Sequence, residues 1–303
     1  MTETLITKLI IEQHFHGAYG IDFNKATIGD VLDLAFEIKK EGVGAIFPTL
    51  VTDSAKNIKR QIKVIKDAAG KQKDGAKILG VHLEGIFINP EKKGIHNPKH
   101  FLEPTVENYK KVEDDFIKIV TLAPELCRDN LIPYLTSKGI KVQAGHCVGG
   151  NLSGCDGVTH TFNAMSGISH RGESTALSAL INDKIYAEII ADGVHVSDDA
   201  LKLLFKSKPS DKIILISDSL PCTNSSIKEF VFADEKIYFD GKRATSAQGT
   251  LAGSTKLLPD IIKILGKKGL FNPQFIENPY KYHKIDLEGQ LVWDNDFNII
   301  SLK

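Results

Sequence analysis

The chain has 303 residues, of which 42% are apolar and 25% are charged, as is typical of a folded globular protein. Its 38 lysine and arginine residues balance 38 aspartate and glutamate residues, which argues against a nucleic-acid-binding protein that relies on a broad basic surface. The apolar runs are shorter than the roughly 18 residues of a membrane span, and the N-terminus lacks the basic and apolar regions of a signal peptide, so we expect a cytoplasmic protein.

Short apolar runs recur along the chain and predict strands. They are rich in Val, Ile and Leu throughout, as in strands that are buried on both faces. Eight such strands are predicted at residues 9–14, 44–48, 78–84, 116–123, 141–146, 158–162, 184–191 and 213–218.

Helical patterns separate most of these strands. The first begins at Thr27, three residues before Asp30, which is the spacing of a capping box. Helices are predicted at residues 27–41, 53–70, 106–114, 128–138, 174–183, 197–206 and 256–268. The alternation of strands and helices indicates a parallel sheet, and eight units favour a (β/α)8 barrel. A doubly wound open sheet is the alternative, but no Gly-x-Gly-x-x-Gly follows the first strand.

Two regions depart from this alternation. Only eleven glycine-rich residues separate His146 from Val158, so we expect a loop there instead of a full helix. A small antiparallel excursion is predicted near residues 228–248, and a hairpin that turns at 294–296 near the C-terminus. We therefore divide the chain into a barrel at 8–270 and a C-terminal extension at 271–303.

Imidazoles and carboxylates gather where the predicted strands end. In a barrel, all carboxyl ends of the strands open on one face, where active sites are built. His14 and His16 lie two apart on the first strand and can face the same side. The residues expected at this face are His14, His16, Glu84, His146, His160, His195 and Asp218. Neutral imidazole and carboxylate are good ligands for zinc and related ions, so the pattern indicates a divalent-metal site.

Other polar residues have a simpler structural interpretation. We expect His82, His100 and His283 to be hydrogen-bonded structural histidines, and Cys147 to be a buried, inert thiol. The four cysteines form no Cys-x-x-Cys pair and are expected to be reduced. No Gly-x-Ser-x-Gly turn indicates a serine hydrolase.

A series of motifs resembles the N-acetylglucosamine-6-phosphate deacetylases of the amidohydrolase superfamily. The two long, specific motifs are GVHLEGIFINPEKKGIHNP at 80–98 and VTHTFNAM at 158–165. Shorter matches follow the same order at 121–125, 144–146, 170–171, 191–196, 217–219 and 249–255. The resemblance implies a metal-dependent barrel hydrolase that removes acetate from an amino sugar phosphate.

The resemblance also implies a role for each matched residue. Glu84, His146 and His160 would hold the main metal ion, while His14 and His16 would contribute to a second ion beside Glu84 and Asp218. Asp218 would be the catalytic acid and base, and His195 would contact the substrate and polarise its carbonyl group. The sugar and phosphate contacts implied are Ile95, His96, Asn163, Ala164, Leu251 and Ala252, together with Arg171, which the family donates across a dimer interface.

These implied roles leave several alternatives open. Zinc is the first expectation for the metal, but iron, manganese and cobalt accept the same ligands, with one or two ions per chain. Only thirteen residues precede His14, so the small β-sandwich of typical relatives is expected to be reduced or missing. The expected protein is a homodimeric deacetylase of N-acetylglucosamine 6-phosphate. The alternatives are the same chemistry on another N-acetylated amino sugar or amide, and a non-catalytic sugar-phosphate-binding protein.

Overall fold

A sheet of parallel strands forms the centre of the computed structural model, which describes residues 4–303. The strands follow one another in chain order around the sheet, and each strand range predicted from the sequence overlaps an observed strand. They are Ile10–Phe15 (β2), Val43–Leu50 (β5), Val81–Glu84 (β7), Ile117–Leu122 (β8), Lys141–Ala144 (β9), Gly157–Val158 (β10), Tyr186–Ile189 (β11) and Ile213–Leu215 (β12), with Lys77–Ile78 (β6) pairing with β5.

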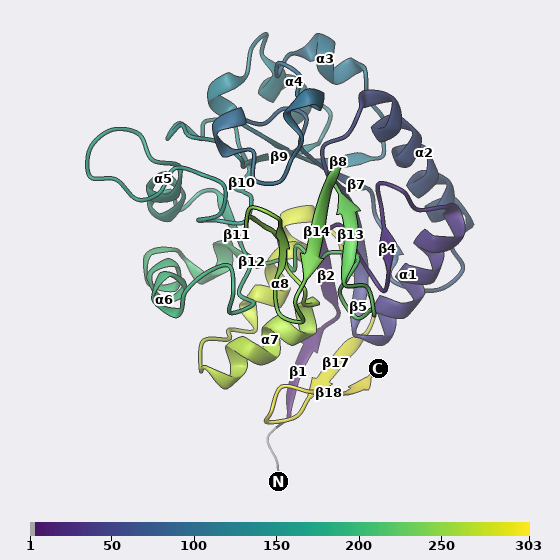
Figure 1. The fold of residues 1–303 in the computed structure, drawn as a ribbon. Coiled ribbons are helices and arrows are strands. Elements are labelled where there is room, and N and C mark those ends of the chain that lie inside the picture. The colour runs from purple at the N-terminus through teal and green to yellow at the C-terminus, as the bar shows by residue number, and fades with distance from the viewer. Residues whose placement is uncertain (1–3) are drawn as a thin grey trace.

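The sheet curls until its first and last strands meet at their carboxyl ends. There the Asp218 N–H donates to the His14 carbonyl at 2.9 Å, and the His16 N–H donates to the Ser219 carbonyl at 2.9 Å. Helices surround the strands (Figure 1). The protein is therefore a (β/α)8 barrel and not an open sheet, as the alternation predicted.

The helices cover the outside of the barrel. Their bounds are Ile28–Lys40 (α1), Ala55–Lys71 (α2), Val106–Lys110 (α3), Leu131–Ser137 (α4), Thr175–Ile181 (α5), Asp198–Ser207 (α6), Leu258–Lys267 (α7) and Gln274–His283 (α8). Thr27 and Asp30 form the predicted capping box at the start of α1. The residues between His146 and Val158 contain no helix, also as predicted. None of the helices in residues 4–303 is both long enough and apolar enough to cross a membrane.

Helix α8 is absent from the sequence prediction, because Pro279 lies inside it and normally breaks a helix. It packs against β2 and β12, on the side of the barrel where those two strands come together. The division of the chain at residue 270 stays a prediction, since this helix of the proposed extension is part of the barrel wall.

Small antiparallel sheets complete the fold. Glu229–Phe232 (β13), Glu235–Phe239 (β14), Ala244–Ser246 (β15) and Leu251–Gly253 (β16) form the predicted excursion, and its leading hairpin lies in front of the strands in Figure 1. Leu5–Lys8 (β1), Gln290–Trp293 (β17) and Ile299–Leu302 (β18) form a three-stranded sheet where the two ends of the described chain meet. Gly17–Ala18 (β3) and Ile21–Asp22 (β4) form a short hairpin.

Candidate metal centre

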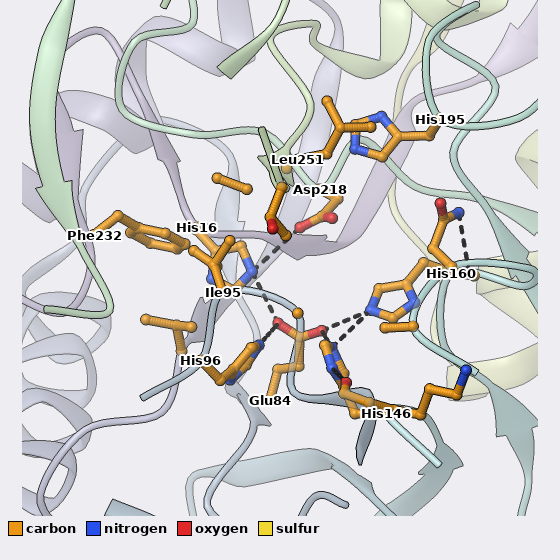
Figure 2. A pocket seen from close by; sticks show the side chains of 18 of the residues that line it. His16, Glu84, Ile95, His96, His146, His160, His195, Asp218, Phe232 and Leu251 are labelled. Carbon is orange, nitrogen blue, oxygen red and sulfur yellow. Dashed lines mark hydrogen bonds and ion pairs between the residues drawn. The ribbon is translucent and has the colours of Figure 1, made fainter. Parts of the chain in front are cut away.

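A cavity of about 440 Å³ opens at the carboxyl ends of the strands. Figure 2 shows imidazoles and carboxylates from separate strands pointing into it. Its lining includes the predicted residues His16, Glu84, Ile95, His96, His146, His160, Asn163, Ala164, His195, Asp218, Leu251 and Ala252. Side chains that lie far apart in the sequence therefore meet at one face of the barrel.

One carboxylate oxygen of Glu84 faces two imidazoles. Glu84 Oε1 lies 3.2 Å from His146 Nε2 and 2.9 Å from His160 Nε2, and the two nitrogens are 3.2 Å apart. Ligands that share one zinc-like ion, with bonds of about 2.0–2.2 Å, lie roughly 3.0–3.5 Å from one another. The triangle of Glu84, His146 and His160 therefore has the size of a metal-ligand set.

The other carboxylate oxygen of Glu84 faces a second cluster. Glu84 Oε2 lies 3.0 Å from His16 Nε2 and 3.5 Å from His14 Nε2. Asp218 Oδ1 lies 3.2 Å from His16 Nε2 and 3.5 Å from His14 Nε2. The buried ligand atoms of His14, His16 and Asp218 lie within 4.8 Å of one another. Two adjacent clusters that share Glu84 are consistent with a binuclear metal site.

Three of these residues have unusual backbone conformations. His146, His160 and Asp218 have φ values of 48°, 29° and 52°, in the left-handed region that is strained for side chains other than glycine. Extended pairing cannot continue through such residues. This corrects the sequence prediction, which put His160 inside a strand and His146 and Asp218 at the ends of strands. These three residues lie beyond β9, β10 and β12, where the turning backbone directs their side chains toward Glu84.

In His146 and His14, the hydrogen bond made by Nδ1 determines that Nε2 is the nitrogen available to bind a metal. His146 Nδ1 donates to the Lys92 carbonyl at 2.7 Å, which leaves Nε2 free to act as a ligand. His14 Nδ1 lies 3.3 Å from Glu188 Oε2, and His14 Nε2 is buried without a hydrogen-bond partner. A buried imidazole nitrogen aimed at two carboxylates and lacking a partner fits a site that holds a cation.

Strong electrostatic coupling joins the carboxylates and the imidazoles. Burial opposes ionisation of Glu84, yet the neighbouring His14 and the hydrogen bonds from the imidazoles hold its pKa well below the usual value. Burial likewise opposes ionisation of Asp218, but His16 and His14 lower its pKa. The two carboxylates raise the pKa of His16 to about 9 despite its burial. The centre is therefore a concentration of negative charge that requires protons or cations beside it.

His195 approaches the cavity from the loop after β11. Its Nδ1 lies 2.8 Å from Asp192 Oδ2, and Asp192 also accepts the backbone N–H groups of Val194 and His195. Burial opposes protonation, but the Asp192 carboxylate raises the pKa of His195. The ring is thus held in one orientation, with Nε2 left to face a ligand.

Of the predicted site residues, His14 and Arg171 do not line this cavity; His14 belongs to the second cluster, whereas Arg171 belongs to neither cluster. It lies on an exposed loop, where its backbone N–H donates to Ser169 Oγ at 3.1 Å. His96 does line the cavity, where its Nδ1 lies 2.7 Å from Thr52 Oγ1 and its Nε2 lies 3.8 Å from Glu84 Oε2. His96, Glu84 and His146 form a further possible ligand group.

Some residues at the site were missed by sequence reasoning. Phe232 reaches the cavity from the antiparallel excursion, and its ring packs edge-on against His16. Glu188 carries no motif that marks it, because it lies within an apolar strand. The histidines predicted to be structural, His82, His100 and His283, all have hydrogen-bond partners, and all four cysteines are free.

The barrel and its centre define the chain as a metal-dependent hydrolase of the amidohydrolase type. It is 33% identical over 260 residues to the N-acetylglucosamine-6-phosphate deacetylase of Bacillus subtilis, a match that covers 81% of this chain and 65% of the relative. It is 30% identical over 270 residues to the enzyme of that name from Haemophilus influenzae, covering 85% and 70%. The chain belongs to the N-acetylglucosamine-6-phosphate deacetylase family.

Further comparisons agree with the fold and broaden the range of relatives. An N-acetylgalactosamine-6-phosphate deacetylase from Escherichia coli O157:H7 is 31% identical over 263 residues, covering 83% of this chain and 69% of the relative. The crystal structure of the N-acetylglucosamine-6-phosphate deacetylase from Pasteurella multocida superposes with a TM-score of 0.88 at 26% identity, covering 98% of this chain and 84% of that one. No family model matches the chain. The chain spans about two thirds of the length of the curated relatives it matches.

Proposed function

We propose that this chain is a metal-dependent deacetylase that hydrolyses N-acetylglucosamine 6-phosphate to glucosamine 6-phosphate and acetate. The observation that supports it most directly is the position of Glu84, whose two carboxylate oxygens each face a cluster of imidazoles at the base of the cavity. Family membership supports the same reaction.

The donor set fits divalent ions such as zinc, iron, manganese or cobalt. We propose that Glu84, His146 and His160 hold the main ion, and that His14, His16 and Asp218 can hold a second beside it. Such an ion, when bound, lowers the pKa of water and polarises a carbonyl group. We name zinc first because imidazole and carboxylate are common zinc ligands.

We propose that Asp218 transfers the protons of the reaction and that His195 polarises the amide carbonyl group. Asp218, ionised by its imidazole neighbours, accepts the proton of the attacking water and returns it to the nitrogen of the leaving amine. His195, oriented by Asp192, donates toward the amide carbonyl oxygen, on which negative charge develops. The amide C–N bond breaks, and acetate and the free amine are released.

The rest of the cavity would bind the sugar phosphate. Ile95, His96, Asn163, Ala164, Leu251 and Ala252 line it and are the proposed sugar and phosphate contacts. Arg171 lies outside its own cavity, so we propose that it serves the phosphate of a neighbouring subunit in a homodimer, where a planar guanidinium suits a phosphate. A cytoplasmic location follows from the proposed substrate, since a charged sugar phosphate crosses membranes poorly.

Acetate release from defined sugars tests this function. We expect turnover of N-acetylglucosamine 6-phosphate to exceed that of the unphosphorylated sugar and of N-acetylgalactosamine 6-phosphate. The galacto isomer is the second candidate substrate, because a relative of that name matches about as well. Faster release from the galacto isomer would change the substrate, and equal rates with and without phosphate would remove the phosphate role of Arg171.

Metal analysis separates the enzyme from a non-catalytic sugar-phosphate-binding protein. We expect the purified protein to contain metal and Glu84→Gln to lose most of it, because Glu84 contributes to both clusters. Tight binding of the sugar phosphate without metal or turnover would instead indicate the binding protein.

A further inference from the structure

A buried carboxylate lies directly beneath the metal centre. Glu188 belongs to β11, and its side chain is fully buried inside the barrel. Its Oε1 accepts the side-chain amide of Gln13 at 2.5 Å and that of Gln143 at 3.1 Å. Its Oε2 lies 3.3 Å from His14 Nδ1. Nothing in the reaction proposed above uses this residue.

The surrounding hydrogen bonds determine what Glu188 offers to His14. His283 Nε2 lies 2.8 Å from Gln13 Oε1, so that oxygen accepts and the Gln13 amide nitrogen is left to donate to Glu188. A carboxylate that already receives two amide donors is an acceptor for His14 as well. His14 Nδ1 therefore carries the proton, and the lone pair of His14 Nε2 faces Glu84 and Asp218.

We infer that Glu188 is the positioning residue of His14, which makes the His14, His16 and Asp218 cluster able to hold its own cation. The inference rests on the proposed metal-dependent function. A carboxylate that orients a ligating histidine raises the basicity of that ligand and fixes its tautomer. His146 depends on a different acceptor, the Lys92 carbonyl, so the effect of Glu188 is confined to one of the two clusters.

The variant Glu188→Gln tests this with little change of shape. Its amide oxygen would accept from Gln13 and Gln143, so its NH2 group would face His14 Nδ1. The His14 proton would then move to Nε2, where it blocks the ligand lone pair. Titration of metal-free protein with cobalt(II), followed by the cobalt absorption bands and by bound metal per chain, measures the two sites separately.

We expect wild-type protein to bind two cobalt ions per chain. In Glu188→Gln one ion should bind as in wild type. The affinity for the other ion should fall by about 10- to 100-fold, the usual effect of removing such a partner. Ile189→Val, the next residue along β11 and also fully buried, is the matched control and should leave both ions unchanged. Unchanged binding in Glu188→Gln, equal weakening of both ions, or a single ion in wild type would each overturn the inference.

A milder variant covers the case in which Glu188→Gln does not fold. Gln143→Met keeps the size of the side chain but removes one donor to Glu188, and it should weaken the same single ion by several-fold. Wild-type cobalt binding in a folded Gln143→Met would also count against the inference. Acetate release by wild-type protein is assayed separately, so that a failed deacetylase and a failed role for Glu188 give different results.

Discussion

Glu84 and Asp218 are both buried carboxylates of the centre, but their neighbours differ. Glu84 touches imidazoles of both clusters, whereas Asp218 contacts only His14 and His16. Removing charge from Glu84 should therefore disrupt all metal binding, and removing it from Asp218 should spare the main ion. At the scale of single residues, Asp218 is the position where metal binding and proton transfer can be separated.

Asp218→Asn should keep the ion held by Glu84, His146 and His160 and lose nearly all turnover. An amide cannot accept the proton of the attacking water, and such proton transfer typically contributes about 10²- to 10⁴-fold to the rate. Acetate release and metal content, measured on the same preparation, check this. If the variant turned over at a rate close to wild type, Asp218 would not be the proton carrier.

The hairpin of β13 and β14 is the element that closes the cavity from outside. Its Phe232 lines the cavity and belongs to the same buried apolar cluster as Ile95, which comes from the loop after β7. Asp234 in the hairpin turn contacts that loop. Its Oδ2 accepts a hydrogen bond from Lys99 Nζ at 2.9 Å and lies 3.1 Å from His100 Nε2. An ion pair at the surface therefore connects the hairpin to the loop after β7, and both segments line the cavity.

Asp234→Ala should raise KM by up to about 5-fold and leave kcat nearly unchanged, since exposed pairs of this kind contribute about 0–1 kcal/mol. Losing this ion pair would affect the segments that line the cavity and leave the metal centre unchanged. Steady-state kinetics with the phosphorylated sugar measure the two constants. Asp240→Ala is the matched control, because within residues 4–303 the Asp240 carboxylate accepts only backbone N–H groups of its own turn. A fall in kcat with constant KM would contradict this role.

Helix α8 contributes a half-buried histidine to the base of the barrel. The His283 ring stacks on Phe47, and burial, with a further effect of Lys141, lowers its pKa from 6.5 to about 3. The folded protein therefore keeps His283 neutral, while the unfolded chain takes up a proton below about pH 6.5. The stability that this preference contributes is complete above pH 6.5 and is lost as the pH falls toward 3.

His283→Gln should accordingly lose less stability than wild type on acidification. Each pH unit below 6.5 costs wild type up to about 1.4 kcal/mol through this group, and glutamine does not titrate. Urea unfolding of the metal-free proteins at pH 6.5, 5.5 and 4.5 (~1 pH unit apart) gives the comparison. His170→Gln, at an exposed loop position, is the control. Parallel curves for wild type and His283→Gln would show that His283 is protonated in the folded state.

At the scale of the whole molecule, the metal centre lies across the seam of the barrel. His14 and His16 come from the first strand and the segment after it, and Asp218 follows the last strand. The seam itself is joined by the backbone hydrogen bonds at the carboxyl ends of β2 and β12. A bound ion would therefore connect the two strands that complete the barrel and stabilise its closed form.

Metal removal should lower the melting temperature of the protein. An ion present at about 1,000 times its Kd stabilises by roughly 4 kcal/mol, and in a protein of this size that corresponds to about 10 °C. Thermal unfolding with and without a chelator, followed by re-addition of zinc, measures the shift. Glu84→Gln should show no shift on adding zinc, and an equal shift in that variant would place the stabilising ion elsewhere.

Local residue patterns were sufficient to predict most of the architecture. The apolar strands, the capping box at Thr27 and the glycine-rich loop before β10 are each determined by residues a few positions apart, so they can be recognised without the fold. The identities of most site residues were also predictable, because Glu84, His146 and Asp218 stand at or just after the carboxyl ends of the strands. Helix α8 was missed because Pro279 conceals its periodicity.

Tertiary structure decided which atoms meet. Glu188 lies 174 positions from His14 in the sequence, and only closure of the barrel brings the two side chains into contact. The left-handed backbone at His146, His160 and Asp218 likewise exists because the surrounding strands and loops hold it against its local preference. The position of Arg171 outside the cavity also depends on the path of a surface loop. Sequence alone thus determined which chemical groups are present, whereas long-range packing determined their contacts and orientations, because those depend on strands distant along the chain.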